Sequence, residues 1–247
     1  MSPVAAVFFD LDGTLLDDMA NWRRSVPATV NAVTDRHPHI DADQLEEAYF
    51  VSSTEVWKEI RDNPKPPWGD MDAMTISMRV WGDALASLGE ENPEVLDRAV
   101  GTYRRLRNTG LVKFDDVDEC LDILRTKYRL GVITNGHAET QLPKLDSAAL
   151  SRYFESVTTV DIGHGKPQVE IFEHALNLLR VDAGEAVYVG DYLHWDVGGA
   201  NAAGMKSVWI NRTQENREPA EPEPDAEINS LAELPGVVAA FDAESTR

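Results

Sequence analysis

The amino-acid sequence predicts an α/β fold, with a parallel sheet covered by helices on both faces and a helical domain inserted near its start. From Val112 to Ile210, short apolar runs alternate with helix-length amphipathic stretches, which is the pattern of strands joined by crossover helices. Helical periodicity without strands fills most of the preceding stretch. We therefore predict a core domain of residues 1–17 and 113–247 and a helical cap domain of residues 18–112.

Composition limits the classes of protein and partner. The 247 residues include 43 acidic and 23 basic side chains, and the resulting net charge of −20 disfavours nucleic acid and anionic membranes as partners. The single cysteine, Cys120, lies in an apolar-periodic stretch and is expected in the core, without an intrachain disulfide. No apolar window approaches the roughly 20 residues that span a bilayer, and no targeting segment is evident. We expect a cytoplasmic protein.

The first strand, Ala5–Phe9, runs directly into Asp10 and Asp12. Two carboxylates one residue apart repel each other unless a cation or a proton lies between them. An EF-hand calcium site is excluded, because Leu15 stands where that loop needs glycine and Asn21 where it needs glutamate. A simple solvated turn remains an alternative on local evidence.

The inserted domain is predicted to be helical throughout. Its four expected helices, each with apolar residues at three- and four-residue spacing, are Asn21–Arg36, Asp43–Arg61, Met71–Leu88 and Pro93–Asn108. Three prolines in residues 63–69 forbid a continuous helix through the middle of the domain. The sequence Asn108-Thr109-Gly110 predicts the end of the last helix and a hinge back to the core.

The rest of the chain is predicted to alternate between helices and strands. The expected strands are Leu130–Ile133, Ser156–Asp161, Ala186–Val189 and Ser207–Ile210, and the expected helices are Val117–Lys127, Glu139–Leu150 and one ending near Leu179. Residues 212–225 are acidic and proline-rich and predict a surface segment, while Ala226–Phe241 predicts an edge strand and a last helix.

Polar side chains follow the predicted strands at the points where the strands end. Asp10 follows the first strand, Thr134 the second and Asp191 the fourth, and Lys166 comes soon after the third. Ligands of such sheets bind in the crevice outside the carboxyl ends of the strands. We therefore expect these groups, with Asp12, to converge on one crevice.

The chemistry that suits this set of groups is phosphoryl transfer. Mg²⁺ prefers hard oxygen ligands and can bridge carboxylates and a phosphate oxygen. Lys166 and Thr134 would hold the remaining phosphoryl oxygens. Asp10 is placed to attack phosphorus and form an aspartyl-phosphate, and Asp12 to protonate the leaving oxygen and later activate water.

These residues carry a resemblance to a known family. The segments Asp10–Thr14, Thr134–Gly136, Lys166-Pro167 and Gly190–Asp196 resemble, in order and separation, the four motifs of the haloacid dehalogenase-like (HAD-like) hydrolase superfamily. The likeness spans about residues 4–212. Longer stretches are similar to the helical-cap branch that contains N-acylneuraminate-9-phosphatase and related small-metabolite phosphatases. The resemblance implies a Rossmann-like parallel sheet with the cap inserted between its first two strands.

The resemblance also implies the roles of the metal-binding and catalytic residues. It makes Asp10 the nucleophile and a Mg²⁺ ligand, and Asp12 the acid/base that binds the ion through its backbone carbonyl. Asp191 is implied as the remaining metal ligand. Asp196 is implied as a supporting acid, although capping of the following helix is an alternative reading of that position. Dehalogenases of the superfamily lack the second acid of the first motif, so Asp12 favours a phosphatase.

Three residues are implied to bind the substrate phosphate: Thr134, Asn135 and Lys166. Thr134 has capping of a turn as its alternative, and Asn135 has orientation of its loop. Neither a P-loop nor a dinucleotide fingerprint occurs, because Gly163-His164-Gly165 lacks the further glycine that such a fingerprint needs.

The sequence as a whole predicts a Mg²⁺-dependent phosphatase acting on a small phosphorylated metabolite. By resemblance a sugar phosphate fits best, followed by a nucleoside monophosphate or phosphoglycolate. A phosphomutase that uses the same aspartyl-phosphate and a non-catalytic phosphate-binding or metal-binding protein are the alternatives. The oligomeric state cannot be read from the sequence.

Overall fold

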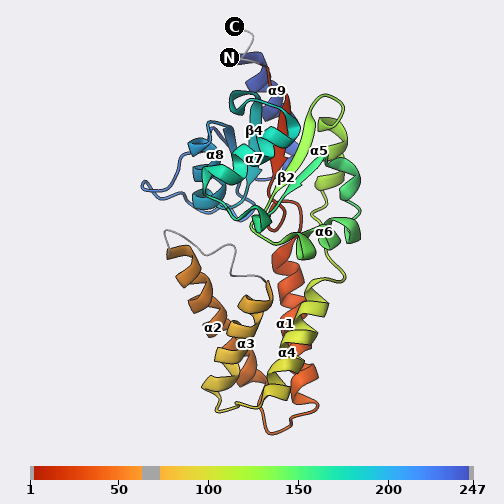
Figure 1. Cartoon of the computed structure of the whole chain (residues 1–247), viewed down its shortest axis with the longest axis vertical. Helices are drawn as coiled ribbons and strands as arrows, with labels where there is room; N and C mark the ends of the chain where they lie inside the picture. Colours follow the sequence, from red (N-terminus) through yellow and green to blue (C-terminus); the bar gives the residue numbers. More distant parts are fainter. Residues whose placement is uncertain (1–2, 63–72, 245–247) are drawn as a thin grey trace. The chain divides into compact units, whose positions relative to one another are not determined.

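The computed structural model describes residues 3–62 and 73–244. The chain divides into two compact units, one formed by Met1–Asp17 with Val112–Arg247 and the other by Asp18–Leu111. The first unit is α/β and the second is helical (Figure 1). The predicted helix break at 63–69 lies outside the described residues.

The α/β unit contains a sheet whose described strands are all parallel, in the order β3-β2-β1-β4-β5-β6. The strands are β1 (Ala6–Phe9), β2 (Arg129–Ile133), β3 (Ser156–Thr158), β4 (Ala186–Gly190), β5 (Lys206–Ile210) and β6 (Ala226–Ile228). This confirms the predicted α/β fold with a parallel sheet core. Because the strands are parallel, their carboxyl ends share one edge of the sheet.

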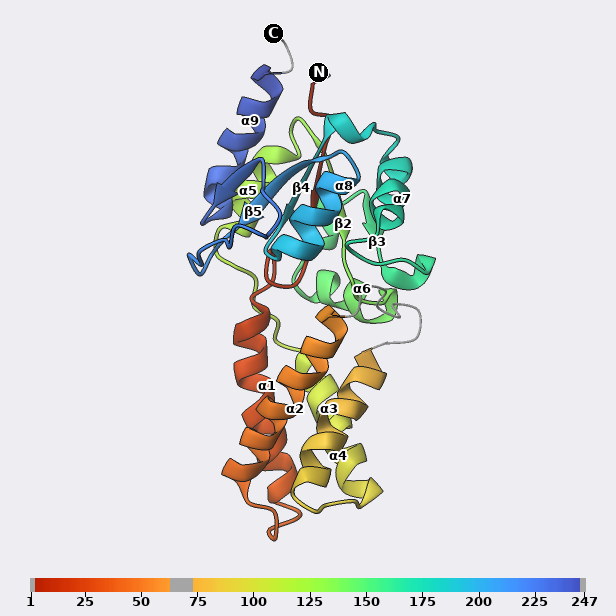
Figure 2. The ribbon, with the colours of Figure 1, turned by 90° about the vertical axis from the view of Figure 1, so that its left-hand side faces the viewer.

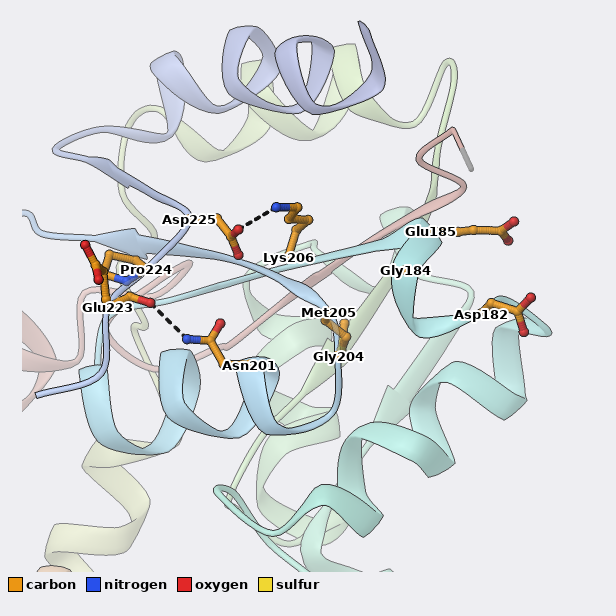
Figure 3. Close-up of a pocket in the computed structure, with 10 residues that line it drawn as sticks. All are labelled: Asp182, Gly184, Glu185, Asn201, Gly204, Met205, Lys206, Glu223, Pro224 and Asp225. Atoms are coloured by element: carbon orange, nitrogen blue, oxygen red, sulfur yellow. Dashed lines mark hydrogen bonds and ion pairs between the residues drawn. The ribbon is translucent and has the colours of Figure 1, made fainter. Parts of the chain in front are cut away.

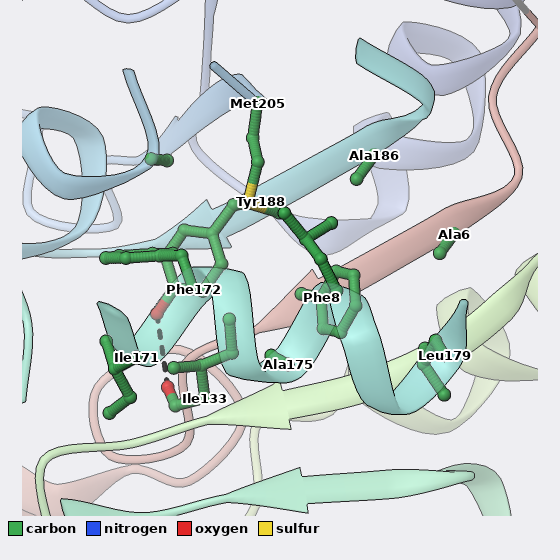
Figure 4. Close-up of a cluster of buried hydrophobic side chains, with 12 residues drawn as sticks. Ala6, Phe8, Ile133, Ile171, Phe172, Ala175, Leu179, Ala186, Tyr188 and Met205 are labelled. Atoms are coloured by element: carbon green, nitrogen blue, oxygen red, sulfur yellow. Dashed lines mark hydrogen bonds between the residues drawn. The ribbon is translucent and has the colours of Figure 1, made fainter. Parts of the chain in front are cut away.

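The central strand β1 is buried on both faces, which explains its unbroken run of apolar residues. It pairs with β2 on one side and β4 on the other, with Phe8 opposite Gly131 and Tyr188. On one face, Phe8 and Tyr188 pack against Phe172 and its neighbours on helix α7, Val169–Leu179 (Figure 4). A Cβ at position 131 would overlap the Phe8 ring, so only glycine fits there without a shift of the ring. Burial of these side chains holds β1 in place, and the predicted site residue Asp10 directly follows it.

Helices cover both faces of the sheet. Helices α7 and α8 (Gly198–Ala202) contact each other, as do α5 (Val117–Leu124) and α9 (Leu234–Glu244), and Figure 2 shows these pairs on opposite sides of the strands. Helix α6 (Ala138–Ser147) follows β2, and one π-helical turn, Leu193–Val197, precedes α8. Cys120 on α5 is buried, as predicted.

The helical unit consists, in its described part, of α1 (Asp18–Thr34), α2 (Ala42–Asp62), α3 (Ala73–Ser87) and α4 (Pro93–Arg107). Its centre is aromatic: Tyr49, Trp81 and Tyr103 pack together, and the hydroxyls of Tyr49 and Tyr103 are 2.8 Å apart. The side chain of Asn92 accepts a hydrogen bond from the backbone of Glu94 and so caps α4. None of the described helices combines the length and apolarity needed to cross a membrane.

The helix predicted over Val117–Lys127 stops at Leu124, and two other predicted elements also end three residues early. The strand expected over Ser156–Asp161 stops at Thr158, because Asp161 lies in a 3₁₀ turn and accepts hydrogen bonds from the Thr159 hydroxyl and the Ala138 amide. The helix expected to reach Leu150 stops at Ser147, and Ala149 adopts a left-handed conformation with φ 57°. Both differences arise from local capping and turn contacts that hydrophobic periodicity does not encode.

Candidate active site

Four predicted site residues come from loops at the carboxyl ends of the strands. Asp10 follows β1 directly, and its amide extends the ladder to the Val189 carbonyl at 2.9 Å. Thr134 follows β2 in the same way and donates its amide to Thr158. Asp191 follows β4, and Lys166 lies in the connection from β3 to α7. The crossover connections of the sheet therefore place all four at one edge.

The Lys166 ammonium is the centre of a buried polar cluster. It lies 2.6 Å from Oδ1 of Asp10, 2.6 Å from Oδ1 of Asp196 and 3.0 Å from the hydroxyl of Tyr188. All four residues are buried. The Tyr188 hydroxyl also lies 3.0 Å from the same Asp196 oxygen. A buried ammonium of this kind needs several oxygen partners, and this cluster supplies three.

The pKa values in this cluster indicate a shortage of positive charge. The pKa of Asp10 is raised to about 7, chiefly by burial and also by the carboxylates of Asp196 and Asp12, against the lowering effect of Lys166. Burial alone would lower the pKa of Lys166, but the Asp10 and Asp196 carboxylates raise it above its ordinary value. Negative charge is therefore in excess, because the one Lys166 ammonium faces two carboxylates, each at 2.6 Å. An added cation would complete the charge balance.

Asp191 brings a third carboxylate to the cluster. One oxygen each of Asp10, Asp191 and Asp196 lie within 4.8 Å of one another. Desolvation raises the pKa of Asp191 well above its ordinary value, and the charges of Asp10 and Asp196 raise it further. Asp191 as a residue is exposed, unlike the buried Asp10 and Asp196. Three carboxylates fit a hard divalent ion such as Mg²⁺.

The backbone around Asp191 is fitted to its carboxylate. Gly13 has φ +91°, and a Cβ there would overlap the Asp191 carboxylate, so glycine satisfies both the conformation and the close approach. The Thr14 hydroxyl lies 3.4 Å from Oδ1 of Asp191. From β5, the indole nitrogen of Trp209 donates to the Asp191 carbonyl at 2.9 Å. The β1 and β4 loops are thus joined at this residue.

The two carboxylate oxygens of Asp196 have different partners. Oδ1 accepts from Lys166, whereas Oδ2 accepts from the Tyr192 amide at 2.9 Å inside its own turn. Gly190 lacks a Cβ where the Asp196 carboxyl group lies. Asp196 thus lies beside Lys166 and is also bonded to the backbone of the turn that precedes α8.

Asp12 points toward helix α6. Its Oδ2 lies 2.6 Å from Nζ of Lys144 and 3.1 Å from Nε2 of Gln141, and the same Gln141 nitrogen donates to the Thr134 hydroxyl at 2.8 Å. Lys144 and Gln141 were not predicted as site residues. The available signal was their place on the buried face of α6, three residues apart and in line with Leu145.

Asn135 is bound to the backbone of Lys166. Its amide nitrogen donates to the Lys166 carbonyl at 3.0 Å, and its amide oxygen accepts from the Lys166 amide at 2.6 Å. Both ends of the side chain thus fix the segment that presents the ammonium. Among the described residues, this contact supports the loop-orienting alternative for Asn135.

Comparison with known proteins identifies the family. The model of the haloacid dehalogenase-like hydrolases matches residues 4–204, which is most of the chain. The chain belongs to the haloacid dehalogenase-like hydrolases. As a member of this family it is an enzyme, and its four predicted motifs fall within the matched region.

The relatives of this hydrolase include named phosphatases and a named dehalogenase. It is 29% identical to N-acylneuraminate-9-phosphatase from Mus musculus over 98% of this chain and 96% of that protein. It is 32% identical to glyceraldehyde 3-phosphate phosphatase from Methanopyrus kandleri over 95% of this chain and 97% of that protein. A solved structure of a 2-haloacid dehalogenase from Pseudomonas syringae shares 29% identity and a TM-score of 0.71, covering 96% of this chain and 99% of that one.

The hydrolase also has a hollow of about 630 Å³ at the amino ends of the strands (Figure 3). Asp182, Glu185, Lys206 and Asp225 line it, from the loops that lead into β4, β5 and β6. It contains none of the predicted site residues. We place the active site at the carboxyl end of the strands instead, because the buried carboxylates, the ammonium and the perturbed pKa values are there.

Proposed function

We propose that this hydrolase is a phosphatase for a small phosphorylated metabolite and that it acts through an aspartyl-phosphate on Asp10. The observation that carries the proposal is the buried cluster of Asp10, Lys166 and Asp196, joined by the exposed Asp191 and with Asp12 beside it. A carboxylate nucleophile, an ammonium and an excess of negative charge that calls for a cation suit phosphoryl transfer.

The proposed reaction has two steps. A carboxylate oxygen of Asp10 attacks phosphorus, the bond to the leaving oxygen breaks, and Asp12 gives that oxygen a proton. The resulting acyl phosphate is then attacked by water, whose proton passes to Asp12, and inorganic phosphate leaves with Asp10 restored. Lys166 and Thr134 orient the phosphoryl oxygens, and the Lys166 ammonium neutralises part of their charge. Asn135 holds the Lys166 backbone in place.

We assign the metal site to Asp10 and Asp191, with the Asp12 backbone carbonyl, and the supporting role to Asp196. The donor chemistry fits Mg²⁺, and Asp196 is already engaged with Lys166 and the Tyr192 amide. When bound, the ion reduces repulsion between the anionic nucleophile and the anionic substrate. The Asp12 carboxylate is bonded to Lys144 and Gln141.

For the substrate, a sugar phosphate is the proposal. Its support comes from the relatives named for N-acylneuraminate-9-phosphatase and glyceraldehyde 3-phosphate phosphatase, which cover nearly the whole chain. Nucleoside monophosphates and phosphoglycolate are the next candidates. A phosphomutase would share the first step but return the phosphoryl group to the substrate.

The test is phosphate release from a panel of phosphorylated sugars, nucleotides and short acids, with Mg²⁺ or with EDTA. We expect selective release that needs Mg²⁺ and falls by about 10³-fold or more in Asp10→Asn. Asp225→Asn, a change at the opposite end of the sheet, is the matched control and should keep wild-type rates. Release that persists in Asp10→Asn would remove Asp10 as the nucleophile, and isomerisation without release would favour the mutase.

A dehalogenase is the second candidate, because a solved relative carries that name at 29% identity. The presence of Asp12 argues against it, since attack on carbon with halide departure needs no acid for the leaving group. Chloride release from 2-chloropropionate, measured beside the phosphate panel, separates the two activities. Halide release without phosphate release would replace the phosphatase proposal.

A further inference from the structure

The Asp12 carboxylate is held by two donors from one helix. Lys144 and Gln141 on α6 both donate to its Oδ2 atom, at 2.6 and 3.1 Å. Both side chains are buried, although neither residue type is common in a core. A buried lysine is stable only beside an acceptor of opposite charge, and Asp12 is the carboxylate that Lys144 reaches.

The glycine at position 136 leaves space for the Gln141 side chain to reach Asp12. A Cβ on Gly136 would overlap the Gln141 side chain, so the glycine after Thr134 and Asn135 leaves the path open. The Gln141 amide then donates both to Asp12 and to the Thr134 hydroxyl. Its nitrogen must face Asp12, because an ionised carboxylate only accepts. One amide thereby couples the proposed acid to a proposed phosphate-binding residue.

We propose that Lys144 and Gln141 are positioning residues that fix the Asp12 carboxyl for proton transfer to the leaving oxygen. The inference rests on the proposed phosphatase function. Asp12 sits in a partly exposed loop, where a carboxyl has several rotamers, and two donors on one oxygen select one of them. A displacement of about 1 Å at a reacting group can cost about 10²-fold in rate, so this restraint bears on catalysis.

Comparing substrates with different leaving groups distinguishes positioning of Asp12 from a purely structural role of Lys144 and Gln141, because a structural role would affect both substrates equally. A sugar alkoxide leaves only when it is protonated, whereas p-nitrophenolate leaves as an anion at neutral pH. Loss of the positioning donors should therefore slow hydrolysis of a sugar phosphate much more than hydrolysis of p-nitrophenyl phosphate. Both substrates share the phosphoryl group, so contacts to phosphate affect them alike.

The experiment compares Lys144→Met and Gln141→Leu with wild type on p-nitrophenyl phosphate and on the sugar phosphate that wild type hydrolyses fastest. For Lys144→Met we expect kcat to fall about 10- to 100-fold on the sugar phosphate but less than about 3-fold on p-nitrophenyl phosphate. KM and inhibition by inorganic phosphate should stay within about 2-fold, because the phosphate ligands remain. Lys144→Arg should recover part of the loss.

The matched control is Lys206→Met, which removes a lysine that is also 2.6 Å from an aspartate but lies at the other end of the sheet. Equal losses on both substrates, or no loss on either, would overturn the inference. If Lys144→Met does not fold, Gln141→Leu and Lys144→Arg give the same comparison. Inactivity of wild type on every phosphate ester would instead reject the proposed function.

Discussion

The two ends of the sheet present the same ion pair in two environments. At the carboxyl end, Lys166 lies 2.6 Å from Asp196, and at the amino end, Lys206 lies 2.6 Å from Asp225. The first pair has side chains only 4% and 2% exposed, whereas the second has 34% and 27%. Distance is thus equal and burial is the variable.

This difference is the reason that we propose the active site at the carboxyl end and not in the hollow at the amino ends of the strands. An exposed pair is screened by water and contributes little, about 0–1 kcal/mol. A buried pair has lost its water, so each charge depends on its neighbours and each pKa depends on the arrangement. Only the buried end can therefore tune a nucleophile and bind a cation by geometry.

The largest effect is expected when each lysine is replaced by methionine. Lys166→Met leaves two buried carboxylates without their ammonium, so we expect the free energy of unfolding to fall by about 3–5 kcal/mol. Lys206→Met should cost less than about 1 kcal/mol. Urea unfolding in EDTA measures both without a bound metal. Similar losses in the two variants would show that burial is not the deciding variable.

The strand-end pattern made the core of the site predictable. Asp10, Asp191 and Thr134 follow apolar strands directly, and parallel topology brings such positions together. Hydrophobic periodicity was also sufficient to predict the sheet and most of its helices. The boundaries that differed, after Thr158 and Ser147, depend on turn and capping contacts that arise only in the folded chain.

The partners of these residues were not predictable in the same way. Tyr188 lies inside an apolar strand, where a tyrosine is ordinary core, and nothing in its local sequence indicates that its hydroxyl reaches Lys166. The spacing of Lys144 and Gln141 places them on the buried face of α6, but it does not indicate which residue they contact. Their contacts span 22, 132 and 129 residues, respectively, so they are properties of tertiary packing.

The second prediction replaces a tyrosine at each end of the sheet. Tyr188→Phe keeps the aromatic ring against Phe172 but removes a hydroxyl bonded to buried charges, so we expect a loss of about 1.5–3 kcal/mol. Tyr128, just before β2, bonds to Asp242 at 3.3 Å, and Tyr128→Phe should cost less than about 1 kcal/mol. Thermal unfolding of the two variants makes the comparison. A larger loss in Tyr128→Phe would contradict it.

The smallest loss of stability is expected at Asp161, which tests whether burial or position at the carboxyl end of the sheet determines the loss. Asp161 follows β3 at the carboxyl end, yet its side chain is half exposed. The Thr159 hydroxyl lowers the pKa of Asp161 to about 2, helped by His137 and the Ala138 amide at the start of α6. If burial decides, Asp161→Asn should cost only about 1 kcal/mol at neutral pH, like the loss of a helix cap.

The pH dependence of that loss has a definite sign. Because the folded-state pKa lies below the ordinary value of 3.8, Asp161 stabilises the fold above about pH 4 and loses this contribution as the pH falls toward 2. The stability gap between wild type and Asp161→Asn should therefore be constant from pH 7 to about 5 and narrow below about 4. Urea midpoints measured across this range test it. A gap of several kcal/mol, or one that widens in acid, would mean that position at the strand ends matters more than burial.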